Sequence, residues 1–558
     1  MKMLEASTLI GNVTYITLSH PGRVFAKILS PRDPGIEISY ADLIHRGSQY
    51  ASMYHDKGVK KNEVVVIIHD DTEQTIYAFV GALLHGAIPS IFAHPSVKVS
   101  PNEYGKTLSL LLAVCRTRFL LTYKVLRDQI KDSISPGEVD VMLSDDASMY
   151  AAGGAQRGSY PEEIVLLQHS SGTTGLKKGV ALSNSSVVNQ LRNYAATLEL
   201  NERDKIASWL PLYHDMGLIA CFILPLASGV PLVLMSPFDW IANPTMLLRA
   251  IHDAKCTLCW MPNFAYNFLA SRVTDGDLTN LDLSSMRAFI NCAEPISTAS
   301  HQSFYDRFSN NGIRQEMLCT CYAMAENTFA VTQGGINKPV KNEVLDANAL
   351  RNQKEASLAG PATAARQTTI SSGRLIPNNH VRIVDDRGKQ LPERCLGEIV
   401  IKSDSMLTEY YNRPDLTAQA IKDGWYYSGD LGYMADGELF VLGRIKDLII
   451  VAGKNIYPQD IEEIVSGVEG VYSGRVVAFG IYDEKIGTEE VVILAETTEE
   501  KSKHLGIKLA IAKAVREQLE CVANEIILLP HMWLMKSSSG KISRPGNREK
   551  YLTELRAQ

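Results

Sequence analysis

The chain has 558 residues, of which 45% are hydrophobic and 21% charged, and its formal net charge at pH 7 is −6. This composition argues against a disordered chain and supplies enough apolar side chains for roughly three or four domains. Because the chain is slightly acidic and shows no basic stripe, non-specific nucleic-acid binding is not expected, and a globular enzyme is the default class.

Helical and strand patterns alternate along the first third of the chain. The spacing of apolar residues predicts an amphipathic helix at 39–58, a buried strand at 64–70 and a helix at 75–89 that ends at glycine and proline. Apolar runs at 119–124 and 164–172 predict further strands. This order is typical of a doubly wound parallel sheet in an α/β fold.

A second series of the same kind occupies the middle of the chain and predicts a second doubly wound sheet. From Gly373 onward, short strands separated by DG and RG turns predict a small β-rich subdomain. After Ile461 helices and strands return, which indicates a separate α+β module of about a hundred residues. The expected strands of the second sheet lie within residues 205–211, 229–237, 256–270 and 286–295.

The segment 336–369 is polar, rich in alanine and without strong periodicity. We therefore expect an inserted surface loop between the second sheet and the β-rich subdomain. Its VLDANAL run, residues 344–350, offers an apolar patch that can dock on another surface while the rest of the segment stays polar.

An uncharged stretch runs from Met216 to Phe238 and is long enough to cross a bilayer. Pro225, Gly229 and Pro231 interrupt it, so a buried helix, turn and strand are favoured over a membrane span. The opening MKMLEASTLIGNVTYITLSH also lacks an apolar core of signal-peptide length. We therefore expect a cytoplasmic protein.

The nine cysteines form no pattern typical of a secreted disulfide framework. The pairs Cys256/Cys259 and Cys319/Cys321 are close enough in sequence to suggest zinc, but both stand among apolar residues and no second CxxC lies at a suitable distance. Buried thiols are therefore expected, without a metal site on cysteine.

The strongest local signal is HSSGTTGLKKGV at 169–180, which directly follows a predicted strand. Its glycines let the backbone approach an anion closely, its hydroxyls can donate hydrogen bonds and its lysines add positive charge. The spacing is not that of a Walker A loop. Taken alone, the loop fits a phosphate site and a plain flexible turn equally well.

SSGTTGLKKG resembles the phosphate loop of the acyl-adenylate-forming superfamily, which includes acyl-CoA synthetases, firefly luciferases and peptide-synthetase adenylation domains. Further motifs similar to this superfamily follow in order: CYAMAENT (321–328), YSGDLG (427–432), GRIKDLIIVAGKNIYPQDIE (443–462) and SSSGKISR (537–544). Three more resemble the fatty acyl-AMP ligase branch: SWLPLYHDMGLIA (208–220), MPNFAY (261–266) and NCAEP (291–295). The resemblance covers nearly the whole chain. It implies a large N-terminal domain, residues 1–445, and a small mobile C-terminal domain, residues 446–558.

The resemblance implies a nucleotide site in which three side chains carry most of the chemistry. Glu326 would bind the Mg²⁺ that bridges the phosphates of ATP, because a hard cation prefers carboxylate oxygen. Asp430 would accept both ribose hydroxyls, and Arg444 would hold the ribose and the α-phosphate. The structural alternatives are a solvated glutamate, a turn aspartate and a surface salt bridge. Thr173 would also contact the metal, and the other implied nucleotide-binding residues are Ser170, Ser171, Gly172, Thr174, Gly175, Lys178, Ala293, Glu294, Pro295, Tyr322, Ala323, Met324 and Asn327.

Catalysis would depend on Lys541 in SSSGK, whose ammonium neutralises the two anions that meet when a carboxylate attacks a phosphate. His214 would line the point where the reactants meet, although a core histidine is a fair alternative. Lys446 would stand at the hinge about which the C-terminal domain swings between half-reactions, with a plain linker lysine as the alternative. The acyl pocket would include Met216, Asn263 and Phe264.

Two positions depart from the family motifs. Ala323 stands where the motif YGLAE has glycine, and Cys292 stands where GAEP has glycine. Each adds a side chain near the expected adenine cleft, so the nucleotide affinity or the pocket shape could differ. Neither departure removes a catalytic group.

Taken together, the resemblance implies an ATP- and Mg²⁺-dependent ligase for a fatty or similar apolar acid. The first step would form acyl-AMP and pyrophosphate, and the second would pass the acyl group to the phosphopantetheine thiol of an acyl carrier protein. An acyl-CoA synthetase that uses free CoA is the alternative, and the insertion after Gly335 is the feature that separates the two. A non-catalytic scaffold is disfavoured because Lys541, Glu326 and Asp430 are all present.

Overall fold

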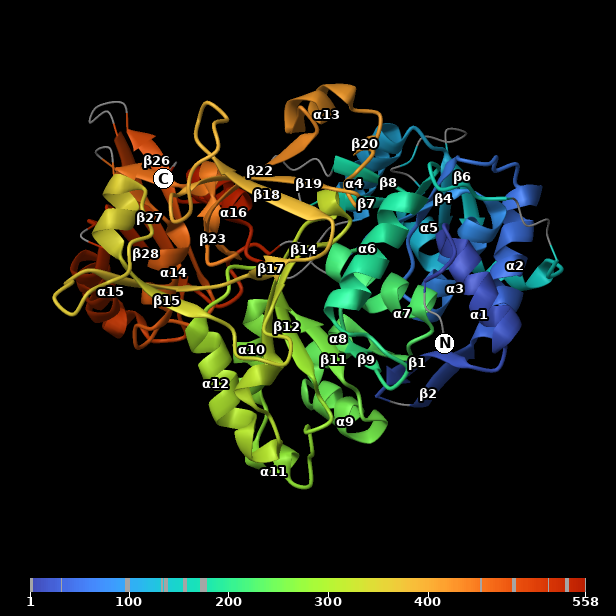
Figure 1. Cartoon of the computed structure of the whole chain (residues 1–558), viewed down its shortest axis with the longest axis horizontal. Coiled ribbons are helices and arrows are strands. Elements are labelled where there is room, and N and C mark those ends of the chain that lie inside the picture. The colour runs from blue at the N-terminus through green and yellow to red at the C-terminus, as the bar shows by residue number, and fades with distance from the viewer. Residues whose placement is uncertain are drawn as a thin grey trace.

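The computed structural model of the chain describes residues 4–31, 33–95, 101–131, 134, 139–153, 158–170, 178–451, 454–483, 488–519, 521–536 and 541–556. Figure 1 shows the chain running from the N-terminal helices on the right, through a central layer of strands, to the C-terminal module on the left. Within the described ranges, no helix combines the length and the apolar character needed to cross a membrane.

The first predicted sheet is confirmed. Four strands lie parallel in the order β4 (Ile88–Ile91), β3 (Val64–Ile67), β5 (Phe119–Thr122) and β6 (Asp140–Leu143). The helices of this region are α1 (Leu9–Ser19), α2 (Tyr40–Asp56), α3 (Thr72–His85), α4 (Pro101–Cys115) and α5 (Lys124–Ile130). Helix α3 begins after the capping residue Asp71 and ends at Gly86, whose φ of +83° suits a left-handed C-cap.

The strand expected at 164–172 does not join this sheet. It is β7 (Ile164–Ser170), which pairs antiparallel with β8 (Lys178–Ser183), and β8 in turn pairs with β20 (Glu409–Tyr410). The prediction of a parallel strand was wrong because only residues 171–177 separate β7 from β8. A connection this short permits a hairpin, whereas a parallel pair needs a crossover of about a dozen residues or more.

The second predicted sheet is also confirmed, but it continues further than expected. Its parallel part has the order β1 (Val24–Ser30), β10 (Leu232–Met235), β9 (Ile206–Ser208), β11 (Leu258–Met261), β12 (Ala288–Cys292) and β13 (Leu318–Ala323). Strand β2 (Asp33–Ser39) adds an antiparallel edge beside β1. The helices of this region are α6 (Asn184–Thr197), α8 (Pro237–Ala242), α9 (Thr245–Ala254), α10 (Asn263–Arg272), α11 (Asp275–Leu278) and α12 (Thr298–Phe308).

The predicted β-rich subdomain is present, and its strands continue the second sheet. A tight turn lets β14 (Ala330–Gly334) pair antiparallel with β13, so the sheet passes into the subdomain without a break and reaches 14 strands. Beyond β14 the strands are β17 (Gly373–Leu375), β23 (Glu438–Arg444), β22 (Trp425–Ala435), β19 (Gly397–Ser403) and β18 (Asn379–Val384), with β21 (Ile421–Lys422) and helix α13 (Pro414–Ala420) beside them.

The uncharged stretch after residue 215 folds inside the molecule, as predicted. It forms a π-helix, η2 (Met216–Ile223), then α7 (Leu224–Ser228), a turn at Gly229 with φ +75°, and β10. The four cysteines of the two close pairs are buried free thiols. Among the described residues, no group of three or more histidine, cysteine or acidic side chains is arranged to hold a metal ion.

The C-terminal module has hydrophobic cores of its own on both faces of a three-stranded sheet. The sheet has the order β26 (Val476–Asp483), β27 (Thr488–Glu496) and β28 (Glu525–Leu529). Helices α14 (Pro458–Ser466) and α15 (His504–Leu519) pack on one face and α16 (Arg544–Glu554) packs on the other. A short hairpin, β24 (Ile449–Val451) and β25 (Lys454–Ile456), leads into the module.

The segment 336–369 is not a polar surface loop. Strand β15 (Asn342–Asp346) pairs antiparallel with β16 (Arg366–Ile370), and a π-helical turn, η6 (Ala349–Gln353), lies between them. We call this segment the insertion hairpin. The expected docking of its VLDANAL run is confirmed: Leu345 and Leu350 are buried against Tyr433 and Phe440 of the β-rich subdomain, whereas Val344 is exposed. The pairing of the two strands was not expected, because most of the surrounding residues are polar.

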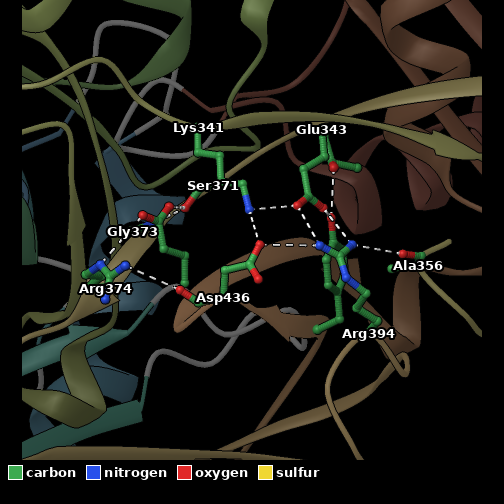
Figure 2. A network of polar contacts seen from close by, with 11 residues as sticks. Lys341, Glu343, Ala356, Ser371, Gly373, Arg374, Arg394 and Asp436 are labelled. Carbon is green, nitrogen blue, oxygen red and sulfur yellow. Dashed lines mark hydrogen bonds and ion pairs between the residues drawn. The ribbon is translucent and has the colours of Figure 1, made fainter. Parts of the chain in front are cut away.

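A buried carboxylate fixes the insertion hairpin to the β-rich subdomain (Figure 2). The side chain of Glu343 is only 4% exposed, and Arg394 contacts both of its oxygens, at 2.9 and 3.1 Å. Lys341 lies 2.9 Å from the same carboxylate, and the hydroxyl of Tyr433 donates to it at 3.2 Å. Burial raises the pKa of Glu343, but Arg394 and Lys341 more than compensate and hold it below its usual value.

Candidate active site

Three of the residues predicted at the nucleotide lie together where β22 and β23 pair. Asp430 stands opposite Arg444 in the strand register, and their side chains are 3.3 Å apart. The hydroxyl of Tyr322 donates to the other oxygen of Asp430 at 2.6 Å. Burial raises the pKa of Asp430, while the charge of Arg444 opposes this rise. The arrangement presents a carboxylate held from two sides, which is suited to accept hydroxyl hydrogen bonds.

Glu326 lies in a short 3-10 turn directly after β13. The hydroxyl of Tyr410, on β20, donates to its Oε1 at 2.8 Å, and the ammonium of Lys178 lies 4.6 Å above the ring of Tyr410. Burial raises the pKa of Glu326, and the negative charge of Asp215 adds to this, whereas Tyr410 and Lys178 oppose it. Residues from three separate segments, Tyr410, Lys178 and Asp215, therefore act on one carboxylate.

His214 and Asp215 form a close pair at the start of helix η2. Nδ1 of His214 lies 2.6 Å from Oδ1 of Asp215, which also accepts from the backbone N–H of Met216 at 2.8 Å. Burial would raise the pKa of Asp215, but His214 and the charge of Lys541 outweigh it and lower that pKa to about 2. Asp215 therefore stays ionised near neutral pH and orients the imidazole, leaving Nε2 for another partner.

The C-terminal module is closed against this site. The charge of Lys541 acts on both Asp215 and the thiol of Cys292, which are residues of the N-terminal domain. The ammonium of Lys536 lies 5.4 Å above the ring of Phe264. The residues between them, 537–540, are outside the described part of the chain. Two further contacts join the module to the N-terminal domain: Ser297 donates to Glu463 at 2.8 Å, and Arg272 donates to Tyr472 at 3.3 Å.

An aromatic wall lies beside the site, on the side predicted to take the acyl chain. Trp209 and Trp240 stack with their rings 3.7 Å apart, and Phe264 packs edge-on against both. Met216 is buried in the same core. Met216 and Phe264 were predicted here from the motifs, but the two tryptophans were not, although both SWLP and FDW contain aromatic residues.

Hydrogen bonds of Asn263 and Glu294 fix the segment that carries Phe264 in this wall. The amide of Asn263 is tied to its neighbours, accepting from Asn291 at 2.9 Å and donating to Ser300 at 3.1 Å. Glu294 accepts from the backbone N–H of Phe264 at 3.0 Å, and so caps helix α10. Both side chains therefore hold the backbone that carries Phe264.

Asn327 also has a supporting place in this structure. Its side chain is buried and donates to Asn379 and to the carbonyl of Ala330, while its oxygen accepts from Ser403. The neighbouring predicted residues Ala323 and Met324 are partly buried, and Pro295 is exposed. Ala293 has a φ of +75°, which alanine rarely adopts, in the loop that follows β12.

The Cys292 departure does not add a side chain to the cleft as expected. Cys292 is buried at 1% exposure, opposite Cys321 on the neighbouring strand β13. Contact with the Cys321 thiol and burial both raise the pKa of Cys292 well above its usual value. The thiol is therefore a protonated core group, and the replacement of glycine is absorbed inside the sheet.

Part of the predicted phosphate loop cannot be placed. Ser171, Gly172, Thr173, Thr174 and Gly175 lie outside the described residues, as does the side chain of Ser170. The two ends of the loop are nevertheless adjacent, because Ser170 on β7 pairs with Lys178 on β8. The charge of Lys178, at the second of these ends, acts on both Glu326 and Lys446.

Lys446 lies in a short 3-10 turn, η7 (Ile445–Asp447), between β23 and the C-terminal module. Burial lowers its pKa, and the nearby charges of Arg444 and Lys178 lower it further. The residue therefore stands at the junction of the two domains and within reach of the site, as a hinge residue would.

The residues present fit a magnesium ion bound together with ATP. Mg²⁺ typically takes one or two protein carboxylates and completes its shell with phosphate oxygens and water. In the described part of the chain, the side chain that bonds Glu326 is Tyr410, and it occupies only Oε1. Oε2 is thus left for a hard cation.

Comparison with known proteins agrees with this geometry. A family model described as "AMP-binding enzyme" matches residues 18–411. The chain is 29% identical over 579 residues to the medium-chain-fatty-acid–[acyl-carrier-protein] ligase JamA of Moorena producens, covering 99% of this chain and 96% of that protein. It is also 29% identical over 504 residues to a Caulobacter vibrioides protein that carries the provisional name acyl-CoA synthetase, covering 89% and 87% of the two chains.

A solved structure described under fatty acyl-adenylate ligases from E. coli and L. pneumophila has the same fold. It superposes with a TM-score of 0.93 at 27% identity, and the match covers 100% of both chains. The large N-terminal domain, the small C-terminal domain and their arrangement are therefore those of a known type of protein.

Proposed function

This chain belongs to the AMP-binding enzyme family, and from that membership we propose that it is a ligase that activates a fatty acid with ATP, giving acyl-AMP and pyrophosphate. The observation that carries the proposal is that the charge of Lys541, from the C-terminal module, acts on Asp215, which pairs with His214 and whose charge acts on Glu326. A lysine of one domain thus faces a site built from the other domain. That arrangement suits a reaction in which two anions must approach each other.

The chemistry follows from the charges of these groups. A carboxylate oxygen attacks the α-phosphorus of ATP, the new P–O bond forms, and the bond to pyrophosphate breaks. Lys541 neutralises the negative charge that gathers around the α-phosphate. Asp430 accepts the ribose hydroxyls while Tyr322 and Arg444 keep its carboxylate in place. When bound, Mg²⁺ supplies charge neutralisation of the phosphates, and Glu326 is the residue that would hold it.

For the second step we propose transfer to the phosphopantetheine thiol of a carrier protein. Two observations support this choice: the relative JamA bears a carrier-protein ligase name, and the insertion hairpin contacts the C-terminal module. Gln367 of the hairpin donates to both oxygens of Asp460 on α14 at 3.2 Å, and Tyr457 packs in the hairpin's apolar cluster. A hairpin that holds the C-terminal module would restrict the swing of this module between the two steps. It would thereby restrict which acceptor can receive the acyl group. Free CoA remains the alternative acceptor.

The adenylation step is tested by exchange of labelled pyrophosphate into ATP. The purified protein should catalyse this exchange only when Mg²⁺ and a suitable acid are both present, because exchange reverses acyl-AMP formation. A panel of fatty acids, aromatic acids and amino acids identifies the substrate class. Exchange supported by amino acids but not by fatty acids would contradict the proposal.

Activity should rise with the length of the acyl chain and then stop rising. The wall formed by Met216, Phe264 and Trp209 is apolar, and each methylene buried against such a surface contributes about 0.8 kcal/mol, roughly a fourfold gain in kcat/KM. The increase should end where the pocket is filled. Rates measured for straight-chain acids of increasing length check this. A preference for short polar acids would show that the wall does not bind the substrate.

The docking of the C-terminal module should weaken as the pH rises toward 7 and then level off. Burial raises the pKa of Asp460 to about 7, although Arg351 and Gln367 oppose this. An acid whose pKa is raised in the docked state binds its proton more tightly there, so docking is favoured at low pH and weakens between the ordinary aspartate pKa of about 4 and the raised value. Asp460→Asn cannot ionise and should remove this dependence. Small-angle scattering across pH 5 to about 9 measures the released fraction.

The same contact gives a test of the acceptor. Deleting the hairpin would uncover Tyr433 and Phe440, so Gln367→Ala is the better variant. It should leave acyl-AMP formation unchanged and permit more acyl transfer to free CoA. If Asp460→Asn showed the same pH response as the unaltered protein, another group would control the docking of the C-terminal module. Efficient acyl-CoA synthesis by the unaltered protein would favour the CoA synthetase alternative.

A further inference from the structure

Tyr410 lies where three segments that are distant in sequence meet. Its strand β20 pairs with β8, where Tyr410 stands opposite Val180, and its side chain is 2% exposed. Its hydroxyl donates to Glu326 at 2.8 Å, and its ring lies 4.6 Å below the ammonium of Lys178. One buried side chain therefore contacts the carboxylate assigned to the metal and the lysine that ends the phosphate loop.

A second tyrosine completes a short relay. The hydroxyl of Tyr426 on β22 lies 3.2 Å from that of Tyr410. Because an ionised carboxylate only accepts, the single proton of Tyr410 points to Glu326, and Tyr426 donates to the oxygen of Tyr410. Burial and the charge of Glu326 raise the pKa of Tyr410 well above its usual value, so the donor keeps its proton.

The backbone beside Glu326 is held independently of Tyr410. Thr328 has a φ of +61°, and the N–H of Phe329 donates to the carbonyl of Asn327 at 2.6 Å, which closes a tight γ-turn. The hydroxyl of Thr328 donates to Ser405, and Gln168 donates to the carbonyl of Thr328. A conformation that threonine rarely adopts is thus fixed from both sides. The freedom left to Glu326 lies in its side-chain torsions.

We propose that Tyr410 is a positioning residue for adenylation: its hydroxyl holds Oε1 of Glu326 so that Oε2 is available to the metal of bound ATP, and its ring supports Lys178. This inference rests on the proposed function and adds a residue to it. Without the hydroxyl, Oε1 of Glu326 would lose the partner that fixes it, and the carboxylate could turn away from the direction in which it faces the metal.

The test uses Tyr410→Phe, which keeps the ring beneath Lys178 and removes only the hydroxyl. Tyr426→Phe is the matched control, because it removes a neighbouring tyrosine hydroxyl that does not touch Glu326. Binding of Mn²⁺ to the protein with a non-hydrolysable ATP analogue is measured by electron paramagnetic resonance. We expect about tenfold weaker Mn²⁺ binding in Tyr410→Phe and about threefold or less in Tyr426→Phe. Binding of the analogue without metal should match the unaltered protein, which also verifies folding.

The Mg²⁺ dependence of pyrophosphate exchange gives the second readout. In Tyr410→Phe, half-maximal exchange should need a higher Mg²⁺ concentration, because the hydroxyl no longer holds Oε1 of Glu326. Unchanged Mn²⁺ binding and an unchanged Mg²⁺ dependence in this variant, while Glu326→Gln loses Mn²⁺ binding, would overturn the positioning role and leave the proposed function intact. Failure of the unaltered protein to exchange pyrophosphate with any acid would instead overturn the proposed function.

Discussion

Replacing Lys541 by alanine is expected to slow acyl-AMP formation by about a hundredfold or more, while ATP still binds. The charge of Lys541 acts on Asp215, and in the proposed mechanism its ammonium neutralises the carboxylate and phosphate as they meet. The nucleotide is held by other groups, among them Asp430 and Arg444. The substitution therefore removes stabilisation of the transition state, so it lowers the rate of acyl-AMP formation more than the affinity for ATP.

Single-turnover formation of acyl-AMP, with ATP binding measured separately by calorimetry, checks this expectation. Lys550→Ala is a control on the same module, since that lysine donates to the carbonyl of Trp533 and stacks on its ring at 3.9 Å. Acyl transfer from supplied acyl-AMP should suffer less, because no two anions are brought together in that step. Adenylation by Lys541→Ala at the rate of the unaltered protein would remove this lysine from the mechanism.

Replacing Arg394 by alanine is expected to loosen the insertion hairpin strongly. It leaves the Glu343 carboxylate buried with Lys341 as its remaining cation (Figure 2). Removing one partner of a buried ion pair typically costs about 3–5 kcal/mol of stability. Because Lys341 still compensates part of the charge of Glu343, we expect a loss of about 3 kcal/mol. About 3 kcal/mol corresponds to roughly a hundredfold increase in the fraction of open hairpin.

Hydrogen exchange of the amides in β15 and β16 measures that opening. Arg374→Ala is the matched control, because Arg374 is 62% exposed and its contact with Glu438 is 3.8 Å long. An exposed pair of this kind contributes about 1 kcal/mol or less. Adding Glu343→Gln to Arg394→Ala should restore part of the protection, since the buried charge is then gone. Equal exchange in the Arg394 and Arg374 variants would show that the buried network does not hold the hairpin.

The parallel strands could be predicted from the sequence because each is a run of branched apolar residues between helical patterns. Val64–Ile67 and Leu232–Met235 are examples in which local composition alone decides the structure. The partner of β7 could not be predicted in this way, because a buried apolar run has the same composition in a parallel sheet and in a hairpin. The short connection to β8 decides its pairing. In the insertion hairpin, the VLDANAL run indicated a docking patch, but the burial of Glu343 could not be predicted. It depends on the charge of Arg394, which stands 51 residues away.

In the candidate site, too, some features follow from the local sequence and others depend on distant residues. Motifs identified Lys541, Glu326 and Asp430, whose positions are set by the local order of residues. The groups that orient them come from elsewhere in the chain: Tyr410 lies 84 residues from Glu326, and Tyr322 lies 108 residues from Asp430. No sequence pattern links such pairs. The roles of Asn263, Glu294 and Asn327 as supports likewise became visible only with their hydrogen-bond partners in place.

The central claim is that a fatty acid carboxylate attacks the α-phosphorus of ATP in this site, and oxygen labelling tests it most directly. The protein is incubated with Mg²⁺, ATP and a fatty acid carrying ¹⁸O in both carboxylate oxygens, followed by a thiol acceptor. If acyl-AMP is the intermediate, the oxygen that bridges carbonyl and phosphorus leaves with the nucleotide, and mass spectrometry should find one ¹⁸O in each AMP released. AMP without label, or formation of ADP and labelled phosphate, would contradict the account.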